Sequence, residues 1–383
     1  MKKYVIELRG VEFHNKGAEL MLHAILAEVR EKLPTAVFVM EKRENSPIYK
    51  QREVGVYTKL NFRRFGINLG KWAWILPKMV RRKLGFVLEK EINVIMDGSG
   101  FAFGDFWGAK KAGERLADHV VKWKRGDKKI ILLPQAFGTF TDEKLKNKMH
   151  VILNNADLIF ARDKYSYEYL GELEGKKANI HLKPDFTNLI KGQIPAYFDK
   201  KQYEVAIIPN NKLLDSNIFK DRNEYITFLQ NVCEYVRIVG RNPFFLIHEG
   251  EKDLKIAENV NELLVSKVPI LKEDNPLYVK GIIGNSVAVV TSRFHGLVSA
   301  LAQAIPCICV GWSHKYQALM EDYDYADGLL ADKDLHSDAL MEKLNMILNA
   351  EYSAEIAFKL REASAQQKKR AQDMWSKVFE VIK

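Results

Sequence analysis

The stretch that decides the fold is VAVVTSRFHGL, residues 287–297. An uncharged apolar run, typical of a buried strand, leads into a tight turn, and a helical pattern from Gly296 to Ala304 leads out. This pattern predicts that Arg293 and His295 lie at a helix N-terminus, where free N–H groups and the helix dipole attract anions. Arginine adds a permanently charged fork for phosphate or carboxylate, and histidine can exchange protons near neutral pH. The turn therefore favours a transferase that acts on an acidic small molecule.

A structural role is the alternative for the same two side chains. Arg293 could pair with a neighbouring carboxylate, and His295 could cap the helix. We favour the functional interpretation because ligand sites in open α/β sheets concentrate at the carboxyl ends of strands. Gly296, which directly follows, would allow a ligand or another backbone to approach closely.

Strand-like and helix-like segments alternate along the whole chain, which predicts an α/β fold. Strand cores such as 130–133 and 307–310 are continuous apolar runs, as in parallel strands buried on both faces. The predicted strands are 4–9, 36–40, 92–97, 129–133, 157–161, 179–183, 203–209, 243–248, 268–271, 287–291 and 306–311. The predicted helices are 17–33, 108–125, 142–154, 163–171, 220–239, 252–265, 276–283, 296–304 and 353–381.

These elements predict two Rossmann-like domains with parallel sheets that face a cleft, and a ligand bound between them at the strand ends. The first domain would span 1–195 and carry a basic insertion at 41–91. The second would span 196–352, and a C-terminal helix would occupy 353–383. A chain of 383 residues suits two domains of ordinary size.

Composition excludes several classes of protein. With 47% hydrophobic residues the chain is globular, and no uncharged apolar run reaches the ~18 residues of a membrane span. Residues 4–9 are too few and too charged for the apolar region of a signal peptide, so we expect a cytoplasmic protein. Cys233, Cys307 and Cys309 are expected to be small buried hydrophobes in a reducing compartment. No Cys/His cluster has zinc spacing, so no metal is predicted.

The net charge of +10 implies an anionic partner. Nucleic acid is disfavoured because the cations do not form a recognised binding module. The basic residues concentrate in 59–90, where Trp72, Trp74, Ile75 and Met79 are interleaved with them. One interpretation is a solvated helical hairpin whose apolar side covers the first sheet. The other is peripheral docking of the exposed cations on an anionic membrane.

Four other motifs follow predicted strands, and each also has a structural interpretation. Arg162 is as well placed for a salt bridge as for a ligand, and the adjacent Asp163 can cap the next helix. Ser99 and Gly100 belong to a glycine-rich turn (97–104) whose spacing departs from the dinucleotide-binding fingerprint.

The remaining two motifs are equally open. Asn15 follows the first strand, and capping of the next helix is its simplest role. His248 and Glu249 could form an acid/base pair or contact a sugar, and helix-start chemistry explains the glutamate about as well.

Taken together, these motifs resemble the polysaccharide pyruvyl transferase family over nearly the whole chain. The segments that carry the resemblance are 15–19 (NKGAE), 97–100 (DGSG), 133–138 (LPQAFG), 156–163 (ADLIFARD), 184–186 (PDF), 292–296 (SRFHG) and Lys315. The resemblance implies a GT-B type fold and transfer of the enolpyruvyl unit of phosphoenolpyruvate to sugar hydroxyls. The product would be a pyruvate ketal on a surface polysaccharide or its lipid-linked precursor. Separately, we expect no cofactor beyond the donor substrate, and peripheral contact with the inner face of the membrane.

By position, the resemblance implies that His295 is the catalytic histidine and that Arg162 and Arg293 bind the anionic donor. Lys315 would be an auxiliary cation. The other predicted substrate-binding residues are Gly296, Asn15, Ser99, Gly100 and His248. Two departures from the family pattern, Glu19 and Ser99, lie in the first domain, where the acceptor is expected to bind.

Two other functions fit parts of the same pattern. A GT-B glycosyltransferase that uses a nucleotide sugar would also need cations near a helix N-terminus, for a diphosphate. A non-catalytic carbohydrate-binding protein could use the cationic surface, but it would leave Arg162, Arg293 and His295 without a shared purpose.

Overall fold

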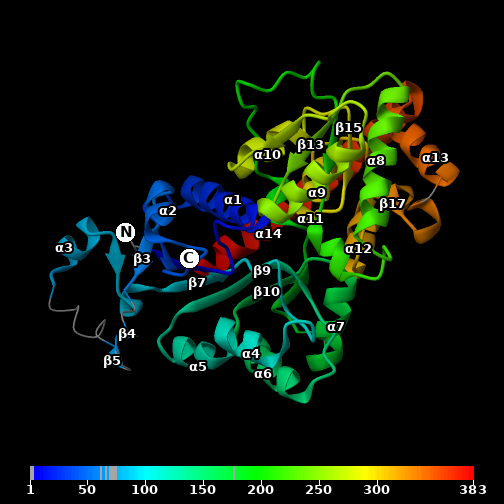
Figure 1. The fold of residues 1–383 in the computed structure, drawn as a ribbon. Coiled ribbons are helices and arrows are strands. Elements are labelled where there is room, and N and C mark those ends of the chain that lie inside the picture. Colours follow the sequence, from blue (N-terminus) through cyan, green and yellow to red (C-terminus); the bar gives the residue numbers. More distant parts are fainter. Residues whose placement is uncertain (1–3, 61–62, 65–66, 69–75, 176, 336) are drawn as a thin grey trace. The chain divides into compact units, whose positions relative to one another are not determined.

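The computed structural model describes residues 4–60, 63–64, 67–68, 76–175, 177–335 and 337–383. They form two compact units (Figure 1). The first comprises Met1–Phe186 and Gln372–Lys383, and the second comprises Thr187–Ala371. The division thus falls a few residues before the boundary at 195/196 that we expected, and the last helix belongs partly to each unit.

The first unit is built on a parallel sheet in the order β11-β10-β9-β7-β1-β2-β3-β6, with β8 paired to β9. Its strands are β1 (Val5–Arg9), β2 (Val37–Glu41), β3 (Tyr57–Lys59), β6 (Phe86–Val87), β7 (Val94–Asp97), β8 (Phe101–Phe103), β9 (Lys129–Phe137), β10 (Leu158–Ala161) and β11 (Ile180–Leu182). A separate antiparallel pair consists of β4 (Arg63–Arg64) and β5 (Ile67–Asn68).

Helices cover both faces of this sheet, as Figure 1 shows for α1 on one side and α4 to α6 on the other. They are α1 (Lys16–Lys32), α2 (Ile48–Glu53), α3 (Lys78–Lys83), α4 (Gly108–Ala112), α5 (Asp118–Arg125), α6 (Glu143–Asn155) and α7 (Lys164–Glu174). A single turn, η2 (Glu89–Glu91), precedes β7, and a π-helical turn, η3 (Gly113–Ala117), joins α4 to α5 without a break. The helix predicted over 108–125 is therefore continuous.

The second unit has a parallel sheet in the order β14-β13-β12-β15-β16-β17. Its strands are β12 (Val205–Ile208), β13 (Pro243–Ile247), β14 (Ile270–Lys272), β15 (Ala288–Thr291), β16 (Cys307–Val310) and β17 (Leu329–Leu330). Its helices are α8 (Arg222–Ile238), α9 (Gly250–Leu263), α10 (Pro276–Ile283), α11 (Phe294–Leu301), α12 (His314–Asp322), α13 (Ser337–Leu348) and α14 (Ala350–Ile382), with short turns η5 (Asn211–Asp215), η6 (Ala326–Gly328) and η7 (Asp332–Leu335).

Successive residues of each strand in the second sheet point to opposite faces and enter different cores. Ile207 packs with side chains of α8, α9 and α13, whereas its neighbour Ile208 packs with side chains of α10, α11 and α12. Both faces are therefore apolar, which explains why the strands read as unbroken apolar runs. The prediction of two Rossmann-like halves with parallel sheets is confirmed.

One strand is longer than its pattern suggested. The apolar run predicted a strand that ends at Leu133, directly before Pro134, which cannot donate a ladder hydrogen bond. In the structure β9 continues to Phe137, and its register against β10 shifts between Ile159 and Ala161. The proline thus coincides with an irregularity in the ladder, where the missing N–H is tolerated.

The basic segment differs most from its prediction. The expectation of a helical hairpin is wrong for the described residues, because β3 and β6 extend the sheet beyond β2 and only the short α3 is helical. The apolar side chains were expected to cover the sheet, but Met79 is 72% exposed and Val80 41%. Trp72, Trp74 and Ile75 lie outside the described residues.

Candidate functional site

Each sheet contains one point where the order of the strands reverses, and such points form ligand crevices in doubly wound folds. In the first unit the chain moves outward from β1 to β2, β3 and β6, then returns to place β7 on the other side of β1. In the second unit β12, β13 and β14 run one way, and β15 returns beside β12. The loops after β1, β7, β12 and β15 are therefore the primary candidates for ligand contact.

The predicted turn of residues 291–297 lies at the reversal point of the second sheet. Thr291 ends β15, and its hydroxyl accepts a hydrogen bond from the Arg293 backbone N–H at 3.1 Å. The Ser292 carbonyl accepts hydrogen bonds from Asn210 Nδ2 at 2.8 Å and from the Tyr316 hydroxyl at 2.9 Å. The loop after β15 is thereby attached to the loop after β12 and to α12.

Arg293 is the N-cap residue of α11, and its side chain is buried among carboxylates. Its two terminal nitrogens form ion pairs with Glu249, which follows β13, and with Asp253 in the first turn of α9. Burial raises the pKa of Asp253, and the charge of Arg293 only partly offsets that effect. Two carboxylates balance one guanidinium, so Arg293 adds no net positive charge here. Its direct contact with an anion stays a prediction.

His295 and Lys315 flank the same aromatic side chain. His295 is half-buried in the first turn of α11, with its ring centroid 5.6 Å from that of Phe294. The Lys315 ammonium lies 5.3 Å from the Phe294 ring centroid and 4.5 Å from that of Trp312. The second unit therefore gathers the predicted histidine and the predicted auxiliary cation at one helix terminus.

Gly296 and His248 also belong to this cluster. A Cβ at Gly296 would lie 2.8 Å from the Thr291 hydroxyl oxygen, so a side chain there would push the helix away from the strand end. His248 is buried immediately before Glu249, one of the two partners of Arg293. Arg293 makes no side-chain cap hydrogen bond to the first turn of α11.

Three of the predicted residues lie at the reversal point of the first sheet. Asn15 caps α1 by accepting the Ala18 N–H at 3.1 Å, which confirms its capping role. Ser99 packs tightly against Gly10, where φ is +82° and an added Cβ would lie 2.4 Å from the Ser99 hydroxyl oxygen. Gly100 also has a positive φ, of +69°. The loops after β1 and β7 therefore touch, and glycine is required at both positions.

Arg162 follows β10, which is separated from β7 by β9. It is buried and pairs with Asp185 at 3.1 Å, so the salt-bridge interpretation accounts for at least part of its role. Asp163 accepts the Ser166 N–H at 2.8 Å and caps α7, as predicted. The reversal point of the first sheet thus holds Ser99 and Gly100, whereas Arg162 lies towards one side of the sheet.

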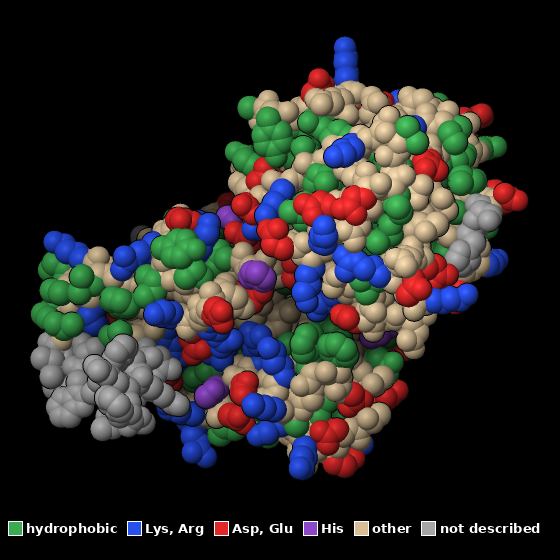
Figure 2. Space-filling model, in the orientation of Figure 1, with side chains coloured by type: hydrophobic (Ala, Val, Ile, Leu, Met, Phe, Trp, Pro, Cys, Tyr) green, Lys and Arg blue, Asp and Glu red, His purple; other side chains and the backbone are tan. Residues whose placement is uncertain are grey.

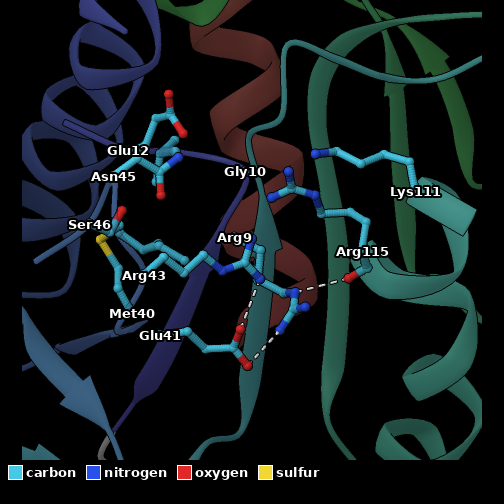
Figure 3. Close-up of a pocket in the computed structure, with 12 residues that line it drawn as sticks. Arg9, Gly10, Glu12, Met40, Glu41, Arg43, Asn45, Ser46, Lys111 and Arg115 are labelled. Atoms are coloured by element: carbon cyan, nitrogen blue, oxygen red, sulfur yellow. Dashed lines mark hydrogen bonds and ion pairs between the residues drawn. The ribbon is translucent and has the colours of Figure 1, made fainter. Parts of the chain in front are cut away.

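Sequence reasoning missed a polar pocket at the carboxyl ends of β1 and β2 (Figure 3). It encloses about 80 Å³ and is lined by Leu8, Arg9, Gly10, Val11, Glu12, Met40, Glu41, Arg43, Asn45, Ser46, Lys111 and Arg115. Its signal in the sequence was the pair Glu7 and Arg9, two charges on the same face of an otherwise apolar strand. We had used these charges only to exclude a signal peptide.

An ion-pair network forms the floor of this pocket. Glu7 has no exposed surface and accepts hydrogen bonds from Arg9 at 2.7 Å and from Lys59 at 3.0 Å. Arg9 also donates to the carbonyl of Arg115 at 3.0 Å. Burial alone would raise the pKa of Glu41, but Arg9 and Lys59 lower it to about 2. The buried cations here are structural, because each has a carboxylate partner.

Comparison with protein families gives one match over most of the chain. The model of the family described as "Polysaccharide pyruvyl transferase" matches residues 15–314. No curated protein matches the chain. No helix in the described part of the chain combines the length and apolar character that a membrane span requires.

Several solved structures share the fold at low sequence identity. UDP-GlcNAc 2-epimerase from Neisseria meningitidis, bound to UDP-GlcNAc, is 9% identical, with a TM-score of 0.63 over 99% of this chain and 100% of that one. Anabaena Alr3699/HepE in complex with UDP is 13% identical, with a TM-score of 0.59 over 99% and 100%. Identity this low shows the fold alone, and the fold is of the GT-B type.

The depressed pKa of Glu41 predicts how stability depends on pH. A carboxyl group whose pKa falls from 4.5 to about 2 on folding stabilises the protein above pH 4.5 and loses that contribution as pH falls towards 2. Glu41→Gln should therefore lower the free energy of unfolding at neutral pH, and the deficit should shrink between pH 4.5 and 2. Urea denaturation across this range measures the deficit, with the exposed Glu44→Gln as control. A deficit that stays constant with pH would contradict the assignment.

Proposed function

The chain belongs to the polysaccharide pyruvyl transferase family, and we propose that it transfers the enolpyruvyl group of phosphoenolpyruvate to saccharide hydroxyls. The product would be a pyruvate ketal on a surface polysaccharide or its lipid-linked precursor. The observation that carries the proposal is the family match over residues 15–314. The matched range includes Arg293 and His295 at the start of α11. No cofactor is needed beyond the donor itself.

Ketal formation needs one proton donor and one proton acceptor. The terminal carbon of the enol takes a proton and becomes a methyl group, which makes the central carbon electrophilic. One sugar hydroxyl attacks that carbon, phosphate leaves, and a second hydroxyl closes the ketal. Of the two hydroxyl protons, one balances the new methyl group and the other leaves with phosphate. An imidazole can serve both transfers because it exchanges protons near neutral pH.

We assign the transfer to His295 and the binding of the donor to the groups around it. The first-turn N–H groups of α11 and the Lys315 ammonium would meet the phosphate and carboxylate charges. Arg293 is engaged by Glu249 and Asp253, so we propose that it holds the turn in position and meets the donor only if Glu249 yields. His248 and Gly296 complete the donor contacts that we propose for the second unit. In the first unit Arg162 stays a predicted anion-binding residue, and Asn15, Ser99 and Gly100 would support the acceptor.

The role of His295 can be tested by kinetics. Positioned acid–base catalysis is typically worth about 10²–10⁴-fold in rate. His295→Ala should lose about that much turnover, while the affinity for phosphoenolpyruvate changes less. Phosphate release and the mass of the pyruvylated glycoside measure turnover, and His150→Ala, a half-buried histidine on α6, is the control. Turnover at the wild-type rate in His295→Ala would exclude the proposed transfer.

A nucleotide-sugar glycosyltransferase is the alternative. The observation in its favour is that the two solved structures of similar fold named above contain UDP-GlcNAc or UDP. Ligands that bind only the folded state raise the unfolding temperature. We expect phosphoenolpyruvate to stabilise the protein and UDP-glucose, GDP-mannose and CMP-sialic acid to have little effect. Stabilisation by a nucleotide sugar together with no response to phosphoenolpyruvate would replace the proposed function by the alternative.

We also propose peripheral contact of segment 59–90 with an anionic membrane, which would bring the enzyme to a lipid-linked acceptor at the inner face. Four cations of the segment form ion pairs with Glu7 or Glu91, and they are Lys59, Lys78, Arg81 and Arg82. The support comes from α3 and its C-cap residue Leu84, where Met79, Val80 and Leu84 are exposed beside Lys78 and Lys83.

Vesicle co-sedimentation tests this contact. The protein should bind anionic vesicles and not neutral ones, and Lys83→Gln should weaken binding roughly fivefold, because a cation near such a surface is worth about 1 kcal/mol. Lys255→Gln, on α9 of the second unit, is the control. Equal binding to neutral and anionic vesicles would rule the contact out.

A further inference from the structure

A periodic row of side chains runs along the continuous helix of residues 108–125 in the first unit. Trp107 lies at its N-cap, and Lys111, Arg115, His119 and Trp123 follow at intervals of four residues. Side chains four apart share one helix face, and the π-helical turn at Gly113–Ala117 offsets part of the drift of that face around the axis.

Contacts along the row confirm that its members adjoin one another and the strand end of β1. The Lys111 ammonium lies 5.7 Å from the Trp107 ring centroid. The His119 and Trp123 rings stack at 5.3 Å, and the Arg9 guanidinium lies 5.1 Å from the Trp123 centroid.

The middle of this row forms one wall of the pocket described above. Figure 3 shows Arg115 and Lys111 reaching in from the helix, and Arg43 reaching in from the opposite side, after β2. Gly10 supplies bare backbone between them. Cations thus approach one small volume from several directions, and the carboxylates of Glu12 and Glu41 also line it. That arrangement suits a tetrahedral phosphate, whose oxygens point several ways, better than a planar carboxylate, which a single arginine fork can satisfy.

The cations in this wall of the pocket are less fully paired with carboxylates than the cations in its floor. Arg9 and Lys59 are matched by Glu7 and Glu41, as described above. Arg43 also pairs with Glu41 at 2.9 Å, but its side chain is 45% exposed. Among the described residues, the ion pair of Arg115 is with Asp97, at 4.0 Å.

Lys111 has two cationic neighbours, Arg115 and Arg43. Within the described residues no ion pair joins it to a carboxylate. Burial lowers the pKa of Lys111, and Arg115 and Arg43 lower it further, ahead of the opposing effects of Glu114 and Glu12. An anion in the pocket would therefore relieve repulsion among three cations.

Aromatic side chains lie beside Lys111, next to the residues that line the pocket. Trp107 is 38% exposed and Phe106 69%, and the two rings meet edge to face at 4.9 Å. An exposed aromatic surface of this kind can pack against the apolar face of a sugar ring. Phosphoenolpyruvate has no ring, so the pairing of cations with aromatics matches a sugar phosphate and not the donor.

We propose that the Arg43, Lys111 and Arg115 pocket binds the phosphate group carried by the saccharide acceptor, while Trp107 packs against its sugar. The acceptor is then a glycosyl phosphate or diphosphate and not a neutral glycan. The identification of the ligand as the acceptor rests on the proposed function, but phosphate binding at this pocket can be tested without turnover.

Calorimetric titration of the full chain with inorganic pyrophosphate tests the phosphate site. Lys111→Gln should weaken pyrophosphate binding about tenfold to hundredfold, because it removes one charge-assisted hydrogen bond. Lys110→Gln is the matched control, since the neighbouring side chain carries the same charge and is 90% exposed. Phosphoenolpyruvate affinity should change less than about twofold in Lys111→Gln. Wild-type protein that does not bind pyrophosphate, or equal binding by both variants, would overturn the site.

Two further titrations test which molecule brings the phosphate. Glucose 1-phosphate should bind wild type more tightly than inorganic phosphate, and Trp107→Ala should remove most of that difference, about twofold to tenfold. No difference in wild type would overturn the sugar contact, and loss of phosphoenolpyruvate binding in Lys111→Gln would reassign the pocket to the donor. If the variants behave as expected but the protein forms no ketal with any acceptor, the proposed function fails and the phosphate site stands.

Discussion

A buried carboxylate in the first strand organises the first unit. Glu7 has no exposed surface, and an isolated charge in that position would cost several kcal/mol. Arg9 and Lys59 compensate it, and both are drawn from strands of the same sheet. Because Arg9 also donates to carbonyls of Glu114 and Arg115, it fixes the π-helical turn against the strand end. The position of Lys111 and Arg115 at the pocket therefore depends on Glu7.

The second unit uses a similar arrangement at its own reversal point. Arg293 follows β15 and is held by Glu249 and Asp253, much as Arg9 ends β1 and is held by Glu7 and Glu41. In both cases a strand-end arginine is already balanced by carboxylates and ties neighbouring loops together. In the two proposed sites, ligand charge is then met by cations on the adjoining helices, Lys315 in one unit and Lys111 with Arg115 in the other. On the face that Figure 2 shows, acidic and basic side chains are intermingled, which fits local pairing better than one broad basic surface.

The architecture could be predicted because its signals are local. Continuous apolar runs such as 307–310 identify strands buried on both faces, and the helix predicted at 276–283 has those bounds in the structure. The segment 41–91 could not be predicted, because β3 and β6 contain only three and two residues and take their structure from the sheet edge they join. The candidate site residues also differ in how far the sequence could predict them. Arg293 and His295 follow an obvious strand, whereas the pocket combines residues from positions 9, 43, 111 and 115, whose proximity depends on the folded sheet.

The last helix has a consequence for the order in which the protein assembles during synthesis. α14 packs Leu360 in a core of the second unit and then returns Trp375 to the first, where its ring lies 6.0 Å from that of Phe186. Translation delivers residues from the N-terminus onward, and domains generally fold as they emerge. The first unit, although it begins the chain, lacks its final residues until the whole second unit has left the ribosome. The half that is translated first is therefore the half that is completed last.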